Sequence, residues 1–229
     1  MNNKATKSTL VIGDVHGLTY WKKAVEDNPA CRTIFIGDYL DPYETISNEQ
    51  LINNLTEIIQ LKKDNPDNVI LLLGNHDLHY FCEDIFGSSG RFNNKIAETA
   101  KELFTENLPL FTYAFQEGTR LFTHAGVSHE WFINDFKGDP TKNIADQLNN
   151  PLPEQVYPLH QAGEARGGPW CSIGGIFWAD ISELDNPLQG YHQYVGHNRV
   201  GQIRVHTKNE GQITFCDCLY NEIYLKLDK

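Results

Sequence analysis

The sequence predicts an α/β fold, and three patterns lead to this prediction. In the first half of the 229 residues, short apolar runs of strand type alternate with segments of helical periodicity. Several of these runs end in Gly followed by a polar side chain, which is how strands end at the carboxyl edge of open α/β sheets. Beyond residue 200 the pattern is one of strands and turns alone.

Five apolar runs are predicted to be strands that lead into polar clusters. Each is short and rich in Val, Ile, Leu, Phe or Tyr, the residues that favour strands. They cover residues 9–12, 33–36, 69–73, 120–123 and 194–195.

The clearest predicted helix covers residues 48–63, because apolar residues recur at helical spacing from Leu51 to Ile59. Ser47 or Asn48 can cap its first turn, and two lysines in its last turn suit the helix dipole. Further helices are expected over residues 94–105 and, from weaker patterns, over 20–27, 131–136 and 141–148.

Residues 150–175 are predicted to be a long irregular loop, because Pro and Gly punctuate this stretch repeatedly. Long loops inside a compact domain often line a binding site, so this one is the expected rim of a substrate site. Later strands at 202–207, 212–219 and 222–227 predict a closing antiparallel meander. The polar clusters are distributed over most of the chain, so residues 1–229 are expected to form one domain.

Composition limits the classes of function. The formal net charge is −11 and no basic run occurs, which argues against an extended nucleic-acid surface. The apolar stretch at residues 10–12 is too short for a signal segment or a membrane span. Five cysteines without regular spacing do not form a disulfide framework, which favours a reducing compartment and a cytoplasmic protein. Apolar and polar residues alternate from Ile213 to Leu219, which favours a strand there over a thiolate metal site at Cys216 and Cys218.

The polar clusters at the strand ends contain the ligands of a two-metal centre. Carboxylates and imidazoles suit hard or borderline divalent ions, and a shared anionic ligand holds two such ions about 3.5 to 4 Å apart. Any one cluster alone is more often a turn or a hydrogen-bonded histidine. Together they predict a dinuclear site, with Mn²⁺ expected and Fe or Zn²⁺ as alternatives. The clusters are Gly13-Asp14-Val-His16-Gly17, Gly37-Asp38-Tyr-Leu-Asp41, Gly74-Asn75-His76-Asp77, His124-Ala-Gly126 and Gly196-His197-Asn198.

These clusters resemble those of the calcineurin-like metallophosphoesterases, and in detail those of the serine/threonine phosphoprotein phosphatases with their bacterial and phage members. The similarity runs from Gly13 to the end of the chain. It implies two mixed β-sheets packed in a sandwich and flanked by helices. It also implies a first metal held by Asp14, His16 and Asp38, and a second held by Asp38, Asn75, His124 and His197.

One position departs from the family pattern. After Asp41 the family usually carries Arg-Gly, whereas this chain has Pro42-Tyr43. Proline cannot donate a hydrogen bond to phosphate, so the affinity for a phosphomonoester must be lower or must come from another residue. Arg166 and Arg199 are the candidates for substrate binding, and Arg166 is preferred because its place in the chain is similar to that of another phosphate-binding arginine of the family.

Arg199 also bears on the type of ester. Many phosphodiesterases and nucleases of the superfamily carry a second histidine two positions after the one that corresponds to His197, and this chain has Arg199 there. The resemblance therefore favours phosphomonoesters as substrates. Asp77 and His79 are not assigned to the site, since Asp77 can cap or support its loop and His79 can face a core.

The predicted activity is that of a metal-dependent phosphatase acting on phosphomonoesters, including phosphoserine or phosphothreonine in proteins. Hydroxide generated from water between two cations would attack phosphorus, and His76 would protonate the leaving oxygen. The resemblance places Asp41 beside His76, where its charge would favour the protonated ring. Two other functions stay open, namely a hydrolase of dinucleoside polyphosphates and a non-catalytic interaction module. The presence of all six ligands and His76 argues against the module.

Overall fold

The strands of the computed structural model form two sheets, and the structure describes residues 7–82, 89–168 and 170–228. The first sheet has the order β10-β1-β2-β3-β4 and the second β5-β6-β7-β9-β8. Both are mixed, because β10 is antiparallel to β1, β5 to β6 and β8 to β9. The first sheet consists of β1 (Thr9–Ile12), β2 (Arg32–Phe35), β3 (Val69–Leu72), β4 (Phe111–Thr112) and β10 (Leu225–Leu227). The second consists of β5 (Ala114–Glu117), β6 (Arg120–Thr123), β7 (His192–Val195), β8 (Arg204–Lys208) and β9 (Gly211–Phe215).

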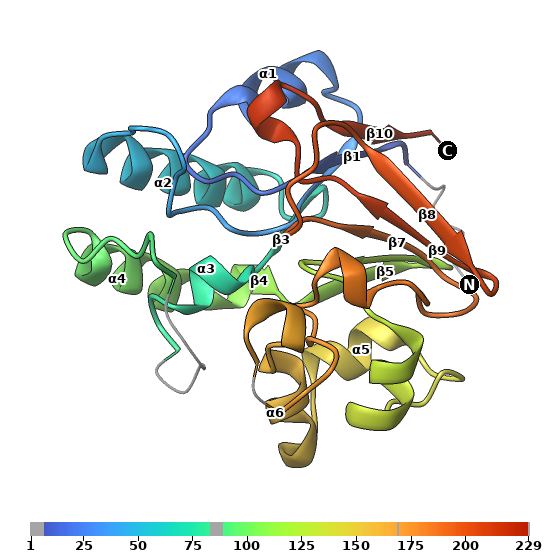
Figure 1. Cartoon of the computed structure of the whole chain (residues 1–229). Coiled ribbons are helices and arrows are strands. Elements are labelled where there is room, and N and C mark those ends of the chain that lie inside the picture. The colour runs from blue at the N-terminus through green and yellow to red at the C-terminus, as the bar shows by residue number, and fades with distance from the viewer. Residues whose placement is uncertain (1–6, 83–88, 169, 229) are drawn as a thin grey trace.

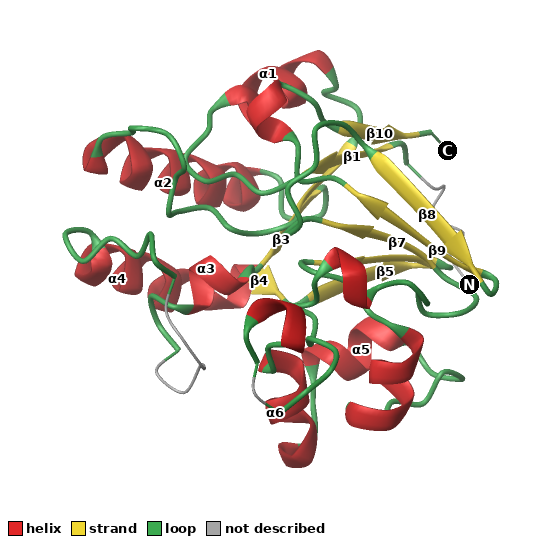
Figure 2. Ribbon diagram, viewed as in Figure 1, coloured by secondary structure: helices red, strands yellow, loops and turns green. Residues whose placement is uncertain are grey.

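The two sheets pack against each other, and helices cover their outer faces (Figure 2). Ile34 and Leu72 from the first sheet join Phe122 and Tyr194 from the second in one buried cluster. Helices α1 (Tyr20–Asp27) and α2 (Asn48–Asp64) contact the first sheet, and α5 (Ile144–Asn149) contacts the second (Figure 1). This arrangement confirms the predicted sandwich of two mixed sheets flanked by helices.

Burial on both faces explains the apolar strands. In β1, Val11 joins the cluster between the sheets, while Leu10 and Ile12 belong to the cluster that includes residues of α1 and α2. Successive side chains of a strand point to opposite faces, so a strand covered on both sides reads as a continuous apolar run.

The predicted helices form, with shifted ends. Ser47 caps α2: its hydroxyl accepts from the amide of Gln50 at 3.2 Å, and the Gln50 side chain accepts from the Ser47 amide at 3.2 Å. Helix α1 has the predicted bounds, α4 covers Ala97–Asn107, and Trp131–Asp135 form a π-helical turn. No helix among the described residues is both long and apolar enough to cross a membrane.

Two sequence predictions need correction. Residues 150–175 are not irregular throughout, because Pro153–His160 form helix α6, with Pro153 at a first-turn position where its missing amide costs nothing. The predicted closing meander is also wrong: β8 and β9 form an antiparallel hairpin, but β9 pairs in parallel with β7 and β10 joins β1 in the other sheet. An apolar strand pattern specifies which face is buried and leaves the choice of partner strand to tertiary packing.

Candidate metal centre

The polar clusters that follow β1, β2, β3, β6 and β7 come together where the ends of the two sheets meet. Each sheet supplies part of the site, the first through the segments after β1 to β3 and the second through those after β6 and β7. Five of the six predicted ligands are at most 4% exposed, and His197 is partly exposed. Figure 1 shows these strand ends near the centre of the molecule.

One carboxylate oxygen of Asp38 lies at the middle of the site. Its Oδ2 atom is 3.8 Å from Nε2 of His16, 3.5 Å from Nε2 of His124 and 4.0 Å from Nε2 of His76. These separations exceed hydrogen-bond lengths. Ligand atoms bound to one ion at ~2.0 to 2.2 Å lie roughly 3 to 3.6 Å apart, so the spacing resembles that of ligands around shared cations.

Backbone carbonyls orient the imidazoles. Nδ1 of His16 lies 2.7 Å from the Leu40 carbonyl oxygen, and Nδ1 of His124 lies 3.0 Å from the Ile36 carbonyl oxygen. In each ring the Nε2 atom therefore faces Asp38, as in sites where a second hydrogen bond fixes a metal-binding histidine. Burial lowers the pKa of both rings to about 3, which keeps them in the neutral form that binds metal.

Asn75 connects the two later histidines. Its Oδ1 atom lies 2.9 Å from Nε2 of His124 and 3.0 Å from Nδ1 of His197. Nε2 of His197 is buried and has no hydrogen-bond partner among the described residues. Asp38, His124 and His197 have ligand atoms within 4.8 Å of one another, and so do Asp38, His16 and His76.

The carboxylates supply an excess of negative charge that cations would balance. Burial, and then the charge of Asp217, raise the pKa of Asp14 well above its ordinary value. Burial and the charge of Asp14 do the same for Asp38. Two groups of carboxylate, amide and imidazole ligands that share Asp38 fit a pair of divalent cations.

The backbone of the site is strained where side chains must converge. His16, Asp38, Asp41 and His197 have positive φ angles of 43°, 53°, 58° and 59°, in the left-handed region that non-glycine residues seldom adopt. Such strain persists only where the surrounding structure holds it, which is common at functional sites.

Glycines allow the carboxylates to approach the following loops. A Cβ atom at Gly74 would overlap Oδ1 of Asp38, and one at Gly196 would overlap Oδ1 of Asp14. The Gly-Asn and Gly-His motifs therefore contain glycine because a ligand carboxylate occupies the space of a side chain.

Asp77 supports the loops without facing the site. Its carboxylate accepts from the amides of Asp38 at 2.7 Å, Tyr39 at 2.8 Å and Gly74 at 2.8 Å. These bonds fix the segment after β2 against the segment after β3. The carboxylate is fully buried, which is possible because backbone donors satisfy it.

His76 and Asp41 form the predicted pair. Nδ1 of His76 lies 2.8 Å from Oδ2 of Asp41, and Oδ1 of Asp41 accepts from the Tyr80 hydroxyl at 2.5 Å. Burial, and then the charge of Arg91, lower the pKa of His76 to about 3, so burial outweighs the effect expected from Asp41. In this structure Asp41 fixes the orientation of a neutral ring.

Three arginines border the site, and sequence reasoning missed one of them. Arg166 pairs with Asp180 at 2.9 Å and donates to the Asn198 side chain at 2.8 Å, next to His197. Arg199 stacks on the rings of Tyr43 and Tyr220, at 4.4 Å and 3.7 Å, and lies 3.5 Å from a carboxylate oxygen of Glu44.

The missed arginine is Arg91, which lies between His76 and Tyr43. Its Nη2 atom is 3.1 Å from Nε2 of His76, and its Cζ atom is 3.5 Å from the centre of the Tyr43 ring. No motif surrounds it in the sequence, so only the fold reveals its position.

Asp217 was also missed as a member of the site, because its segment reads as part of a strand. The structure buries Asp217 beside Asp14.

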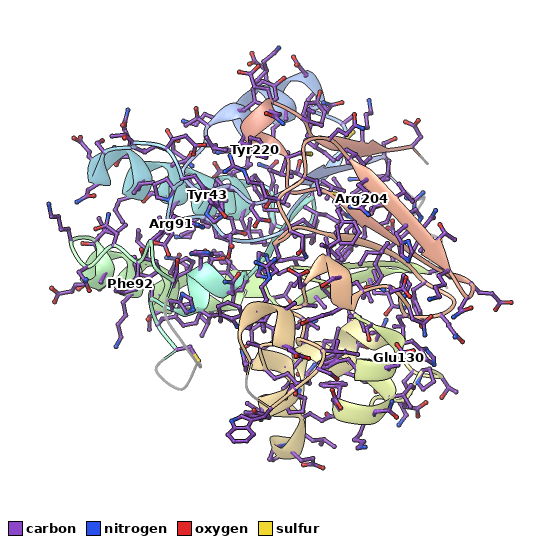
Figure 3. The ribbon with its side chains drawn as sticks, in the orientation of Figure 1. Tyr43, Arg91, Phe92, Glu130, Arg204 and Tyr220 are labelled. Atoms are coloured by element: carbon purple, nitrogen blue, oxygen red, sulfur yellow. The ribbon has the colours of Figure 1, made fainter. Side chains whose placement is uncertain are left out.

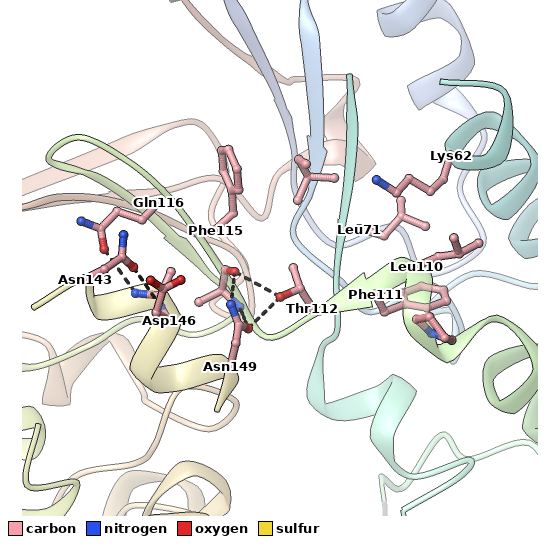
Figure 4. A pocket seen from close by; sticks show the side chains of 14 residues that line it. Lys62, Leu71, Leu110, Phe111, Thr112, Phe115, Gln116, Asn143, Asp146 and Asn149 are labelled. Atoms are coloured by element: carbon pink, nitrogen blue, oxygen red, sulfur yellow. Dashed lines mark hydrogen bonds between the residues drawn. The ribbon is translucent and has the colours of Figure 1, made fainter. Parts of the chain in front are cut away.

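A separate pocket of about 370 Å³ lies where β4 and β5 meet α5 (Figure 4). Asn149 crosses this region: its Oδ1 accepts from the Thr112 hydroxyl at 2.7 Å, and its amide donates to the Ala114 carbonyl at 2.9 Å. The pocket shares no residue with the six ligands, and Asn149 acts there as a link between elements.

The fold and the His/Asp clusters define a metallophosphoesterase. The chain belongs to the calcineurin-like phosphoesterase family, whose model matches residues 7–201. This match confirms the family that the sequence motifs indicate.

Curated relatives match over part of their length. The chain is 29% identical over 139 residues to a symmetrical bis(5'-nucleosyl)-tetraphosphatase of Actinobacillus pleuropneumoniae serotype 5b (strain L20). It is 30% identical over 139 residues to that of serotype 3 (strain JL03). Each match covers 56% of this chain and 48% of the relative, so the chain spans about half the length of the curated relatives it matches.

Two solved structures share the fold. A protein serine/threonine phosphatase from Saccharomyces cerevisiae has a TM-score of 0.54 and 16% identity, over 94% of this chain and 69% of that chain. A cold-active protein tyrosine phosphatase has a TM-score of 0.53 and 18% identity, over 91% of this chain and 69% of that chain. At these identities the likeness concerns the architecture.

Proposed function

We propose that this protein is a metal-dependent phosphatase that hydrolyses phosphomonoesters, including those of phosphoserine or phosphothreonine in proteins. One observation carries the proposal: three imidazole Nε2 atoms, those of His16, His124 and His76, surround one oxygen of Asp38 at 3.5 to 4.0 Å. Two of these rings belong to the proposed metal ligands. The third is bonded to a carboxylate, as a positioned proton donor would be.

The proposed ligands form two groups that share Asp38. When bound, a pair of divalent ions would supply Lewis acidity and lower the pKa of a bound water toward ~7. We favour Mn²⁺, with Fe or Zn²⁺ as alternatives, because the donors are carboxylate, amide and imidazole without a thiolate. The first group is Asp14, His16 and Asp38, and the second is Asp38, Asn75, His124 and His197.

His76 would move the proton. Its Nδ1 faces Asp41 at 2.8 Å, so Nε2 faces the interior of the site, 4.0 Å from Asp38. A phosphoryl group bound next to Nε2 brings negative charge, which raises the pKa of the ring and favours its protonated form in the complex. The proton would then pass from Nε2 to the leaving oxygen of the ester.

Arg166 and Arg199 would also bind the phosphate group of the substrate. The Arg166 guanidinium is held by Asn198, the residue after His197, so its position is coupled to a proposed ligand. Arg199 is one residue further along and lies among the residues that line a small pocket with Asp14 and His16. A planar guanidinium suits two phosphate oxygens at once.

A second candidate function is the hydrolysis of dinucleoside polyphosphates. The observation that favours it is the match to two bis(5'-nucleosyl)-tetraphosphatases, although the chain spans about half their length. Both candidates use the same metal ligands and differ in what must bind outside the phosphate site.

Cys31, Cys171, Cys216 and Cys218 are free thiols in the structure, which supports a reducing compartment such as the cytoplasm as the proposed location.

A substrate panel tests the proposal. We would assay the purified chain with aryl phosphates, phosphopeptides, nucleotides and dinucleoside polyphosphates, each with added Mn²⁺ and after chelation. The expected result is hydrolysis of monoesters that is lost on chelation and restored by Mn²⁺. Preference for dinucleoside polyphosphates would favour the second candidate. No hydrolysis of any substrate with metal bound would leave the interaction module as the better interpretation.

A further inference from the structure

We propose that Arg91 is a phosphate-binding residue, whose guanidinium takes a non-bridging oxygen of the substrate's phosphoryl group beside His76. The inference rests on the proposed phosphatase function and adds a residue that no sequence motif marks. Figure 3 shows Arg91 beside Tyr43.

Arg91 lies next to the proposed proton donor. Its Nη2 atom is 3.1 Å from Nε2 of His76, which is itself 4.0 Å from Oδ2 of Asp38. A phosphoryl group whose leaving oxygen is near His76 and whose other oxygens are near the Asp38 side of the site would therefore lie within reach of Nη2. Arg91 is only partly buried, so a substrate can approach this residue.

The segment after β2 holds this guanidinium in place. Nε of Arg91 donates to the Asp41 carbonyl oxygen at 3.0 Å, and the Tyr43 ring stacks on Cζ at 3.5 Å. Pro42 between them has a fixed φ angle, which stiffens the segment. A guanidinium held on two sides loses little conformational freedom when an anion binds.

Charge distinguishes Arg91 from the other two arginines. Arg166 forms an ion pair with Asp180, and Arg199 forms one with Glu44. Arg91 forms no ion pair with a carboxylate within residues 7–82, 89–168 and 170–228; its partners are the Asp41 carbonyl, the His76 imidazole and the Tyr43 ring. Its positive charge is therefore available to an anion, and a charge-assisted bond to phosphate would replace the contact with His76.

A purely structural role for Arg91 is the alternative, since the same contacts would also fix Tyr43. The two roles differ in one measurable property. Loss of a packing residue lowers stability, whereas loss of an anion-binding residue weakens the binding of phosphate itself.

The test measures the binding of inorganic phosphate to the Mn²⁺-loaded full chain by titration calorimetry, together with KM for an aryl phosphate. Arg91→Ala should weaken phosphate binding and raise KM by roughly 10- to 100-fold, as expected for one charged hydrogen bond. Arg91→Lys should restore part of the affinity, because it keeps the charge and loses the planar fork. Arg204→Ala on β8 is the control and should leave both constants unchanged, since this exposed residue lies outside the site (Figure 3).

The outcomes separate this inference from the proposed function. Phosphate binding by Arg91→Ala with the affinity of the natural chain would overturn the role of Arg91 even if the enzyme is a phosphatase. If the natural chain binds phosphate but hydrolyses no ester, the proposed function fails while reduced binding by the variant still supports Arg91. If Arg91→Ala does not fold, Arg91→Lys decides, and unchanged phosphate affinity in that variant would contradict the inference. Metal content is measured in every sample, because loss of metal would weaken binding for another reason.

Discussion

His76 is the residue on which the proposed chemistry depends most directly, because it is the ring that faces both a carboxylate partner and the interior of the site. Asp41 and Tyr80 form a chain of hydrogen bonds behind it. Such a chain fixes which nitrogen carries a proton when the ring is neutral. In the proposed mechanism, Asp41 and Tyr80 would therefore orient the His76 ring, and the ring would transfer the proton.

Replacing His76 with Asn should lower kcat by roughly 10²- to 10⁴-fold, the usual contribution of a positioned acid. The metal content should stay the same, because His76 is outside the six proposed ligands. Parallel measurement of kcat and of bound Mn²⁺ checks this prediction. Turnover equal to that of the natural chain would exclude His76 as the proton donor.

Gly74 tests how close packing supports the ligands. Because a Cβ atom there would overlap Oδ1 of Asp38, Gly74→Ala should displace that carboxylate and weaken Mn²⁺ binding by roughly 10- to 100-fold, the usual effect of disturbing a residue that orients a ligand. Gly201→Ala is a matched control, since no atom lies within 4 Å of the added methyl group. Titration of both variants with Mn²⁺ gives the comparison, and equal affinities would show that Asp38 tolerates the change.

At the level of elements, helix α6 ends in a partly buried histidine, His160. The ring of His160 stacks on Phe177, with centroids 5.0 Å apart and planes within 5°. Burial lowers the pKa of His160 from 6.5 to about 4. Protonation therefore costs more in the folded chain than in the unfolded chain, and α6 should loosen as the ring becomes charged.

The sign of the pH effect follows from this shift. Above pH 6.5 the ring is neutral in both states and has no effect on the pH dependence of stability; between pH 6.5 and 4 stability falls as the unfolded chain takes up the proton first. His160→Gln should remove this part of the acid-dependent loss. Urea unfolding of the natural chain and of the variant at pH 7.5 and pH 5 measures the change in the free energy of unfolding. An identical decrease in the two proteins would show that His160 does not contribute.

For the whole molecule, metal binding should stabilise the fold. The site lies between the two sheets and contains buried carboxylates that repel one another. Divalent cations would therefore remove an unfavourable electrostatic free energy that is present in the metal-free chain. At a Mn²⁺ concentration about 100 times Kd the gain is about 2.7 kcal/mol, which corresponds to a rise in Tm of roughly 5 to 10 °C for a chain of this size.

Asp38→Asn provides the control for this effect. The variant loses the shared charged ligand, so Mn²⁺ should raise its Tm little, while its metal-free form should be at least as stable as the natural chain because one buried charge is gone. Thermal unfolding with Mn²⁺ and after chelation checks both statements. An equal rise in Tm in the two proteins would place the stabilising ion outside the proposed site.

Much of the fold and of the candidate site follows from local sequence. The strand Thr9–Ile12 and the helix over residues 48–63 were predicted from apolar spacing, because burial on one or both faces leaves a direct pattern. The proposed ligands could be predicted because each lies just after an apolar run of strand type, with a glycine in between for all of them except His124. Strands β4 and β5 and helix α6 were missed, because short edge strands and a helix that contains two prolines carry weak local signals.

The sequence by itself determined the family and the α/β class and predicted the set of proposed metal ligands, since these depend on residues a few positions apart. Only the tertiary structure decided that β10 pairs with β1 in the first sheet, rather than with the hairpin of β8 and β9, and that Arg91 contacts His76. Both depend on contacts between segments that lie far from each other in the chain or belong to no motif. Local sequence patterns do not distinguish between the alternative partners of such segments, so tertiary packing decides which contacts form.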